Sequence, residues 1–256
     1  EQLDLLQVIY VLRHGERTPV RRRLTSAEPP LPHRWNLCHA SQVFGQSVMQ
    51  HTGSDVGLPY GKPHVPRRIE FTVRNDAPQA GEHGDCLLGE LTDKGRKTMQ
   101  HIGEALRARY VDAEHLLPPN LAKEDARSLY LRSTHMSRTI QSLEELVRGL
   151  VGPNAVSTPE ILVRNTFDED LLPNPRKCPK LGVLMQKFAD LAVDVYNPRL
   201  AKYDDVVAPL DGGAAPRLND GPRLSGLFDT MRSATAHGIQ LPQSLENPEL
   251  QTLMEH

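Results

Sequence analysis

The sequence predicts an α/β fold, with a mainly parallel central sheet flanked by helices and a smaller helical cap. The stretch Leu6–Leu12 is an almost unbroken apolar run with β-branched residues, too short for a typical helix and suited to a strand buried on both faces. A second short apolar strand, Ser128–Leu131, is followed by a helical pattern. Amphipathic patterns over 181–195 and 224–234 then predict the cap.

The predicted first strand continues into residues 13–19, which read Arg-His-Gly-Glu-Arg-Thr-Pro. In an open α/β sheet, ligands bind in the crevice beyond the carboxyl ends of the strands. Arginine offers a fork of donors that matches phosphate oxygens, and histidine can attack phosphorus or shuttle a proton near neutral pH. Gly15 lets the backbone turn sharply, and Pro19 fixes where the loop leaves. This stretch predicts the floor of an anion pocket. A surface basic loop with a solvated histidine is the alternative.

The same layout recurs later in the chain. The strand Ser128–Leu131 ends in Arg132, and a helix begins directly after it. Two parallel strands of one sheet would deliver Arg13 and Arg132 to the same edge. The helix N-terminus would add backbone donors for an anion. An ion pair between Arg132 and a nearby carboxylate is the alternative.

Other segments shape the surroundings of that pocket. Thr92 is expected to cap a helix whose apolar stripe forms core packing. Residues 24–84 form a loop-rich insertion with one short strand, Arg68–Arg74, and an insertion of this length is usually functional. A strand over Ile161–Val163 leads into the acidic residues 168–170, which we expect in an exposed loop outside the site. A position facing the substrate cleft is the alternative.

Composition narrows the function classes. The net charge of −2 over 256 residues gives no general attraction to nucleic acid, and the basic triplet Arg21–Arg23 lacks interleaved aromatic residues. The sequence has no apolar run long enough to span a membrane. Cys38, Cys86 and Cys178 are too few for a zinc site or a disulfide framework, which leaves one bridge with a free thiol or no bridge. The chain starts beside its first strand, so any targeting segment is expected to have been removed.

Three segments of the sequence resemble the histidine acid phosphatases, the RHGxRxP branch of the phosphoglycerate mutase-like superfamily. The loop 13–19 matches that signature. The stretch 89–111, GELTDKGRKTMQHIGEALRARYV, is similar to a second family segment. Residues 132–142 match the pattern R-S-T/A-x-x-x-R-T-x-x-S, with Arg138, Thr139 and Ser142 completing it. The segments CLLGELTDKG and LLPNPRKCP look closer to lysophosphatidic-acid-type and fungal acid phosphatases than to phytases.

The resemblance implies a phosphomonoester hydrolase that works at acidic pH through a phosphohistidine. His14 would be the nucleophile, Gly15 would orient its ring through the carbonyl group, and Arg13, Arg17 and Arg132 would bind the phosphate. No cofactor and no metal are expected, and the substrate would be a lysophospholipid or another small organic phosphate. A mutase-type phosphotransferase and a non-catalytic phosphate-binding fragment are the alternatives. The secretory pathway is the favoured compartment, with the mitochondrion as the alternative.

One part of the family's catalytic machinery is absent from the sequence. The family uses a His-Asp pair, whose Asp protonates the leaving oxygen, and this chain has no His-Asp dipeptide. His237-Gly238 is the nearest similar pair, and Glu16 is a conceivable substitute acid. We therefore expect a C-terminal companion fragment that completes the core. Residues 1–23 and 85–165 would form part of the α/β core, 24–84 the insertion that walls the pocket, and 166–256 the cap.

Overall fold

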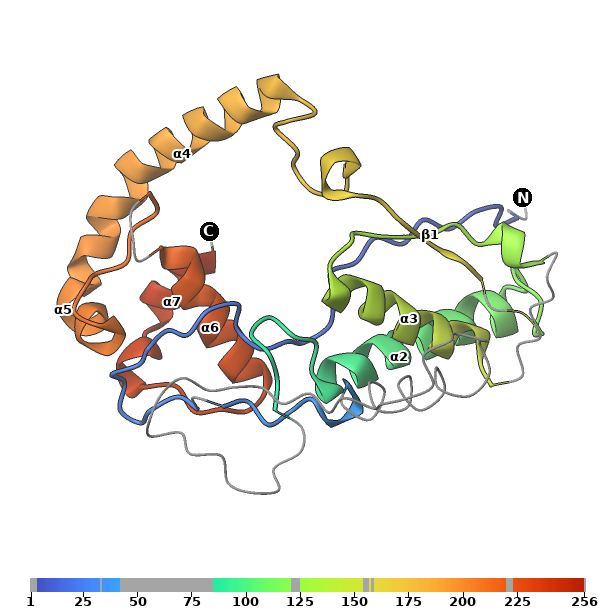
Figure 1. Ribbon diagram of the computed structural model, residues 1–256, viewed down its shortest axis with the longest axis horizontal. Coiled ribbons are helices and arrows are strands. Elements are labelled where there is room, and N and C mark those ends of the chain that lie inside the picture. Colours follow the sequence, from blue (N-terminus) through green and yellow to red (C-terminus); the bar gives the residue numbers. More distant parts are fainter. Residues whose placement is uncertain are drawn as a thin grey trace, which may run out of the picture.

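The computed structural model describes residues 4–32, 34–41, 85–120, 125–153, 157, 159–219 and 223–255. Two groups of elements stand side by side in Figure 1: helices α2 and α3 with a small sheet on one side, and helices α4 to α7 on the other. The blue N-terminal segment and the green segment before α2 run between the two groups. The described residues therefore contain an α/β part and a helical part.

The α/β part is built on two packed helices. Helix α2 spans Asp93–Arg107 and continues as a π-helical turn over Ala108–Ala113, and helix α3 spans Ser137–Val151. The two helices approach closely because glycines lie at their contact: a Cβ on Gly103 would collide with the carbonyl of Leu146 in α3. Beside them, β1 (Leu131–Ser133) pairs in parallel with β2 (Ile161–Val163). The strand predicted over Ile161–Val163 is confirmed.

The helical part contains α4 (Pro179–Leu200), α5 (Asp204–Val207), α6 (Leu224–Ala236) and α7 (Pro248–Glu255). Short 3-10 turns cover Asp125–Ser128, Thr166–Asp168, Ala201–Tyr203, Ala208–Asp211 and Gln243–Leu245. The described start of the insertion belongs to this part, since Leu24, Leu31 and Trp35 are buried in one core with residues of α6 and α7. Among the described residues, no helix is long and apolar enough to span a membrane.

Two strand predictions need correction. Residues Leu6–Leu12 form no strand, and all their apolar side chains except that of Val8 are exposed, with Ile9 at 80% and Val11 at 82%. The physical reason is that no other described segment pairs with this backbone or covers these side chains. The second strand begins later than predicted, at Leu131, because Asp125–Ser128 forms a 3-10 turn. The strand predicted over Arg68–Arg74 lies outside the described residues.

Candidate active site

His14 lies near the start of the loop 13–19, and its hydrogen bonds fix its tautomer. Nδ1 of the ring is 2.8 Å from the carbonyl oxygen of Gly15. A carbonyl oxygen only accepts hydrogen bonds, so Nδ1 carries the proton and donates it. In the neutral ring, Nε2 therefore carries no proton, and its lone pair accepts a hydrogen bond of 3.3 Å from Nε of Arg17.

Burial and neighbouring cations favour the neutral form of the His14 ring. Burial is the largest effect on the pKa of His14 and lowers it. The hydrogen bond with Gly15 raises the pKa, while the charges of Arg13, Arg17 and Arg138 lower it. The net result is a pKa below that of an ordinary histidine. His14 therefore presents an unprotonated Nε2 in a cationic environment, which suits attack on an anionic phosphorus centre.

The loop is held in place by the two other segments that the sequence singled out. The backbone N–H of Gly15 donates a hydrogen bond of 3.0 Å to Oγ of Ser142, on α3. On the other side, a Cβ on Gly15 would lie 2.5 Å from the carbonyl oxygen of Gly95, in the first turn of α2. The three matching motifs therefore meet at one point, where two glycines permit contact between backbones.

The residues after His14 are tied to the entry of α2. Thr18 donates its backbone N–H to Glu90 over 3.0 Å, and Thr92 donates its own to the carbonyl of Glu16 over 3.1 Å. The Thr92 hydroxyl caps α2, as predicted, by accepting a hydrogen bond from the N–H of Gly95. The side chain of Glu16 accepts a hydrogen bond from Thr98.

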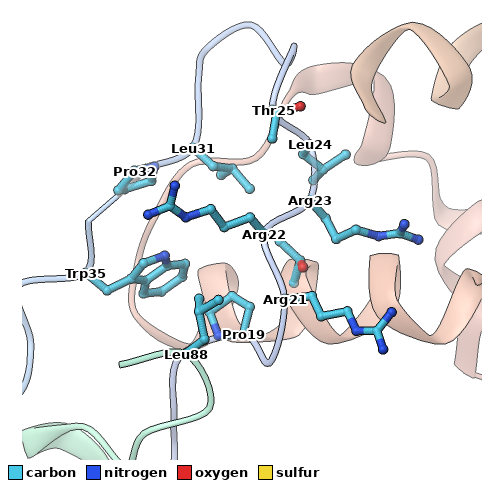
Figure 2. A pocket seen from close by; sticks show the side chains of 11 residues that line it. Pro19, Arg21, Arg22, Arg23, Leu24, Thr25, Leu31, Pro32, Trp35 and Leu88 are labelled. Carbon is cyan, nitrogen blue, oxygen red and sulfur yellow. The ribbon is translucent and has the colours of Figure 1, made fainter. Parts of the chain in front are cut away.

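A pocket opens beside this loop (Figure 2). It is lined by the chain that follows Pro19, with Trp35, Leu88 and Thr230 among the other residues. Arg22 extends across the pocket on the side of Trp35, whereas Arg21 and Arg23 point in the opposite direction. The Arg23 guanidinium forms an ion pair of 3.2 Å with Asp211.

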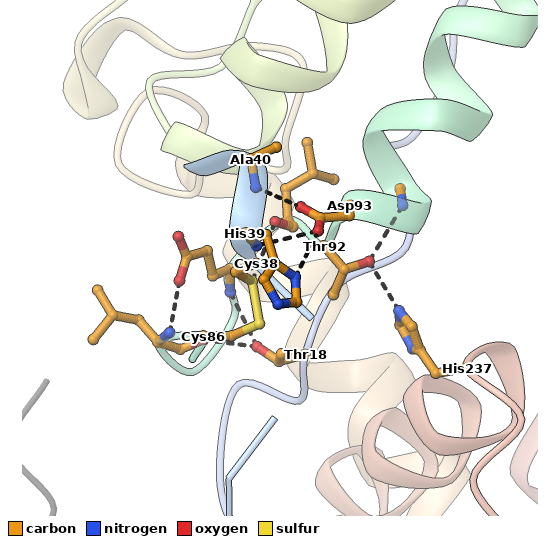
Figure 3. The surroundings of a disulfide bond; sticks show 12 residues. Thr18, Cys38, His39, Ala40, Cys86, Thr92, Asp93 and His237 are labelled. Carbon is orange, nitrogen blue, oxygen red and sulfur yellow. Dashed lines mark hydrogen bonds and ion pairs between the residues drawn. A yellow bond between two sulfur atoms is a disulfide. The ribbon is translucent and has the colours of Figure 1, made fainter. Parts of the chain in front are cut away.

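A disulfide reinforces the same region (Figure 3). Cys38 and Cys86 are bonded across a sequence separation of 48 residues, and Cys178 is free and exposed. This is the arrangement of one bridge with a free thiol. The two cysteines also lie near the carboxylate of Glu90, but their sulfur atoms are bonded to each other and are not available as thiolate ligands for a metal.

The ring of His237 is held by contacts with other protein groups. It follows the last residue of α6, its Nδ1 is 2.7 Å from the carbonyl oxygen of Ser233, and its Nε2 is 2.9 Å from the Thr92 hydroxyl. Its ring also meets that of Trp35 edge-on, with centroids 5.8 Å apart. His237 thereby connects α6 to the cap of α2 (Figure 3).

The family model that describes the histidine phosphatase superfamily (branch 2) matches residues 4–203, about four fifths of the chain. The chain belongs to the histidine phosphatase superfamily. A probable acid phosphatase of Schizosaccharomyces pombe is 36% identical over 97% of this chain and 53% of its own length. Counting factor 60 of Dictyostelium discoideum is 29% identical over 95% of this chain and 56% of its length. The bovine lysophosphatidic acid phosphatase type 6 is 28% identical over 69% of this chain and 38% of its length.

Membership of this superfamily confirms the predicted α/β class and the recognition of the histidine phosphatases. The chain spans about half the length of the first two of these relatives.

Arg132, a predicted phosphate ligand, is paired with carboxylates in this structure. Its guanidinium forms ion pairs with Glu169 over 2.6 Å and with Asp170 over 2.7 Å. The expectation that residues 168–170 form an exposed loop is wrong for Glu169, whose side chain is 3% exposed. Burial raises the pKa of Glu169. Hydrogen bonds from the N–H groups of Leu171 and Asp170 and the charge of Arg132 lower it by more in total, so the net shift is downward.

Two residues of the site had no assigned role at the level of sequence. Arg138 stands within the third motif, and its charge acts on the pKa of His14. Its own pKa is lowered by burial and by the charges of Arg17 and Arg13, so the three cations lie close together. Asp229, on α6, binds Arg17. No sequence signal identified Asp229, because a polar residue in an amphipathic helix is ordinary.

Proposed function

We propose that the protein to which this chain belongs is a phosphomonoester hydrolase that works through a phosphohistidine. The observation that carries the proposal is His14: its Nδ1 is fixed by Gly15, and its Nε2 accepts a hydrogen bond from Arg17. The charges of Arg13, Arg17 and Arg138 act on the same ring. Such a site binds an anion and aligns a nucleophile with it. The acid phosphatases among the relatives support the same reaction.

The reaction divides into two displacements. Nε2 of His14 attacks phosphorus, a P–N bond forms, and the bond between phosphorus and the ester oxygen breaks. The leaving oxygen takes a proton from an acid that residues 1–256 do not supply as a His-Asp pair. Water then attacks the phosphohistidine, the P–N bond breaks, and inorganic phosphate leaves. Arginine side chains offset the charge that gathers on the equatorial oxygens, and one such donor is worth about 2.7–4 kcal/mol of barrier.

Arg132 would join Arg13 and Arg17 at the phosphate. In the structure its partners are Glu169 and Asp170, so phosphate binding would require an exchange of carboxylate for phosphate oxygens. Asp170 is the partner that can leave, because its side chain is 48% exposed, whereas Glu169 is buried.

A companion segment would complete the sheet. The exposed apolar residues of Leu6–Leu12 lack a partner among the described residues, and a single unpaired extended segment with this composition is unstable in water. We expect a strand from the remaining half of the protein to pair with it and to bring the missing proton donor.

The substrate class follows the relatives. A lysophospholipid or another small organic phosphate is proposed, because a lysophosphatidic acid phosphatase is among the similar proteins. The Cys38–Cys86 disulfide supports an oxidising compartment such as the secretory pathway, since disulfides persist there.

The test uses the full-length protein and p-nitrophenyl phosphate at acidic pH. We expect turnover and an acid-labile phosphoenzyme that His14→Ala abolishes. His101→Ala is the matched control, because His101 is exposed on α2. Turnover that requires a bisphosphate primer would indicate a mutase instead. Phosphate binding without a phosphoenzyme would indicate a non-catalytic protein. In either case the proposal is wrong.

A further inference from the structure

Arg17 is held by a carboxylate from a distant part of the chain. Asp229 lies on α6, 212 residues from Arg17, and its two oxygens accept hydrogen bonds from both terminal nitrogens of the guanidinium group. The Nη2–Oδ1 distance is 2.5 Å and the Nη1–Oδ2 distance is 3.1 Å. The Arg17 side chain is 8% exposed and that of Asp229 is 17% exposed. The pair is therefore largely withdrawn from water. Charge-assisted hydrogen bonds are strong in such a place.

The same carboxylate also holds the backbone of the loop. Oδ2 of Asp229 accepts a third hydrogen bond of 3.1 Å from the N–H of Val20. Asp229 thereby fixes the Arg17 side chain and the chain three residues further on. A residue with only a packing role would not need two charged contacts and a backbone contact with one loop.

The ion pair between Arg17 and Asp229 determines which edge of the Arg17 guanidinium remains open to an anion. Arginine grips an anion with two parallel bonds either through its end, formed by both Nη atoms, or through its side, formed by Nε and one Nη. Asp229 occupies the end, and Nη1 also donates to the carbonyl oxygen of Thr18 over 2.8 Å. The side edge is left, and its Nε–H points to Nε2 of His14.

We propose that Asp229 is a positioning residue of the phosphate site, which turns the side edge of the Arg17 guanidinium toward Nε2 of His14. The inference rests on the proposed function. A phosphate whose phosphorus lies at Nε2 would accept two parallel hydrogen bonds from Nε and Nη2 of Arg17. Without Asp229, the guanidinium could rotate and offer its end, which points its donors away from the reacting nitrogen.

The charge of Asp229 suits this role at low pH. Burial raises the pKa of Asp229. Hydrogen bonds from Arg17 and Val20 and the charges of Arg17 and Arg13 lower it by more in total, so its pKa lies below that of an ordinary aspartate. The carboxylate therefore stays ionised in moderately acidic solution. It also offsets part of the repulsion among the three arginines, since its charge raises the pKa of Arg138.

The test compares Asp229→Asn with Asp204→Asn in the full-length protein. Asp204 is a matched control because it forms an equally two-pronged pair with Arg217, over 2.8 and 2.6 Å, outside the loop 13–20. We expect Asp229→Asn to raise both KM for p-nitrophenyl phosphate and the inhibition constant of inorganic phosphate by about tenfold or more, as for a truncated buried charge pair. Asp204→Asn should leave both constants close to wild type. Asp229→Glu should recover part of the loss, because it keeps the charge.

A pH profile separates positioning from a loss of folding. In the wild type and in Asp204→Asn, KM should rise at the acid end as Asp229 takes up a proton and releases Arg17. In Asp229→Asn this rise should be missing. Equal constants and equal profiles for the two Asn variants would overturn the inference, whatever their thermal midpoints.

Calorimetric titration of inorganic phosphate reads the same site without turnover. A wild-type protein that binds phosphate but forms no phosphohistidine would refute the proposed function, and the phosphate affinities of the two Asn variants would still decide the role of Asp229. If the wild type binds no phosphate, both proposals are wrong.

Discussion

Gly95 lies against Gly15 so closely that neither residue has room for a side chain. A Cβ on Gly15 would lie 2.5 Å from the Gly95 carbonyl oxygen, and a Cβ on Gly95 would collide with the backbone of Glu16. The first turn of α2 is thus in backbone contact with the loop that carries His14. Because backbone atoms cannot rotate away as a side chain can, the loop position depends on this contact.

Gly95→Ala should destabilise the protein by about 1–3 kcal/mol, the usual cost of overpacking, although alanine favours a helix. Urea unfolding measures the change. Gly182→Ala in α4 is the control, because among the described residues its new Cβ would meet only the Pro175 Cβ, at 3.3 Å, a neighbour that must shift slightly. A Gly95→Ala protein as stable as Gly182→Ala would contradict the backbone contact.

The acid limb of the kcat/KM profile should lie below the ordinary histidine pKa of about 6.5. Burial of His14 and the charges of Arg13, Arg17 and Arg138 all disfavour its protonated form. Loss of one cation removes part of this effect, so Arg138→Gln should raise the pKa of His14 and move the acid limb to higher pH. A pH series on the full-length enzyme tests this, and an acid limb that moves to lower pH would contradict the assignment.

Asp170 should compete with phosphate for Arg132. Asp170→Asn removes an exposed partner of that guanidinium, so phosphate should bind more tightly, by about fivefold at most, because exposed ion pairs are weak. Asp168→Asn makes the same charge change two residues away and is the control. The measurement is the inhibition constant of inorganic phosphate in both variants. Equal constants would show that Arg132 does not exchange Asp170 for phosphate.

Loss of the Cys38–Cys86 bridge should destabilise the protein strongly. A loop of 48 residues is closed by this bond. In the chain-entropy account its removal costs about 4 kcal/mol. Denaturant unfolding of a Cys38→Ser, Cys86→Ser double variant measures this loss. Cys178→Ser should leave the unfolding midpoint unchanged, because Cys178 is free and exposed.

The sequence predicts local features well here because each has a local cause. The cap at Thr92 and the apolar stripe of α2 follow from residue types at fixed spacing, and the structure has both. The disagreement at Leu6–Leu12 has the opposite origin. A strand exists only with a partner, and the described chain holds none for that stretch.

Partners that are distant in sequence leave no local pattern. The pairing of Arg132 with Glu169 crosses 37 residues, and that of Arg17 with Asp229 crosses 212. The motif around Arg138 was visible, but its action on His14 depends on how α3 packs against the loop. Charged residues on helix faces are common, so burial and contact had to come from the structure.

The long separation between Arg17 and Asp229 also affects the order of folding. Residues 13–20 emerge from the ribosome early. The contact with Ser142 can form only after α3 has been synthesised, and the contact with Asp229 only after α6 has been synthesised. Loop closure over such distances is slow compared with helix formation. The loop 13–19 therefore gains its full set of contacts only after Asp229 has been synthesised.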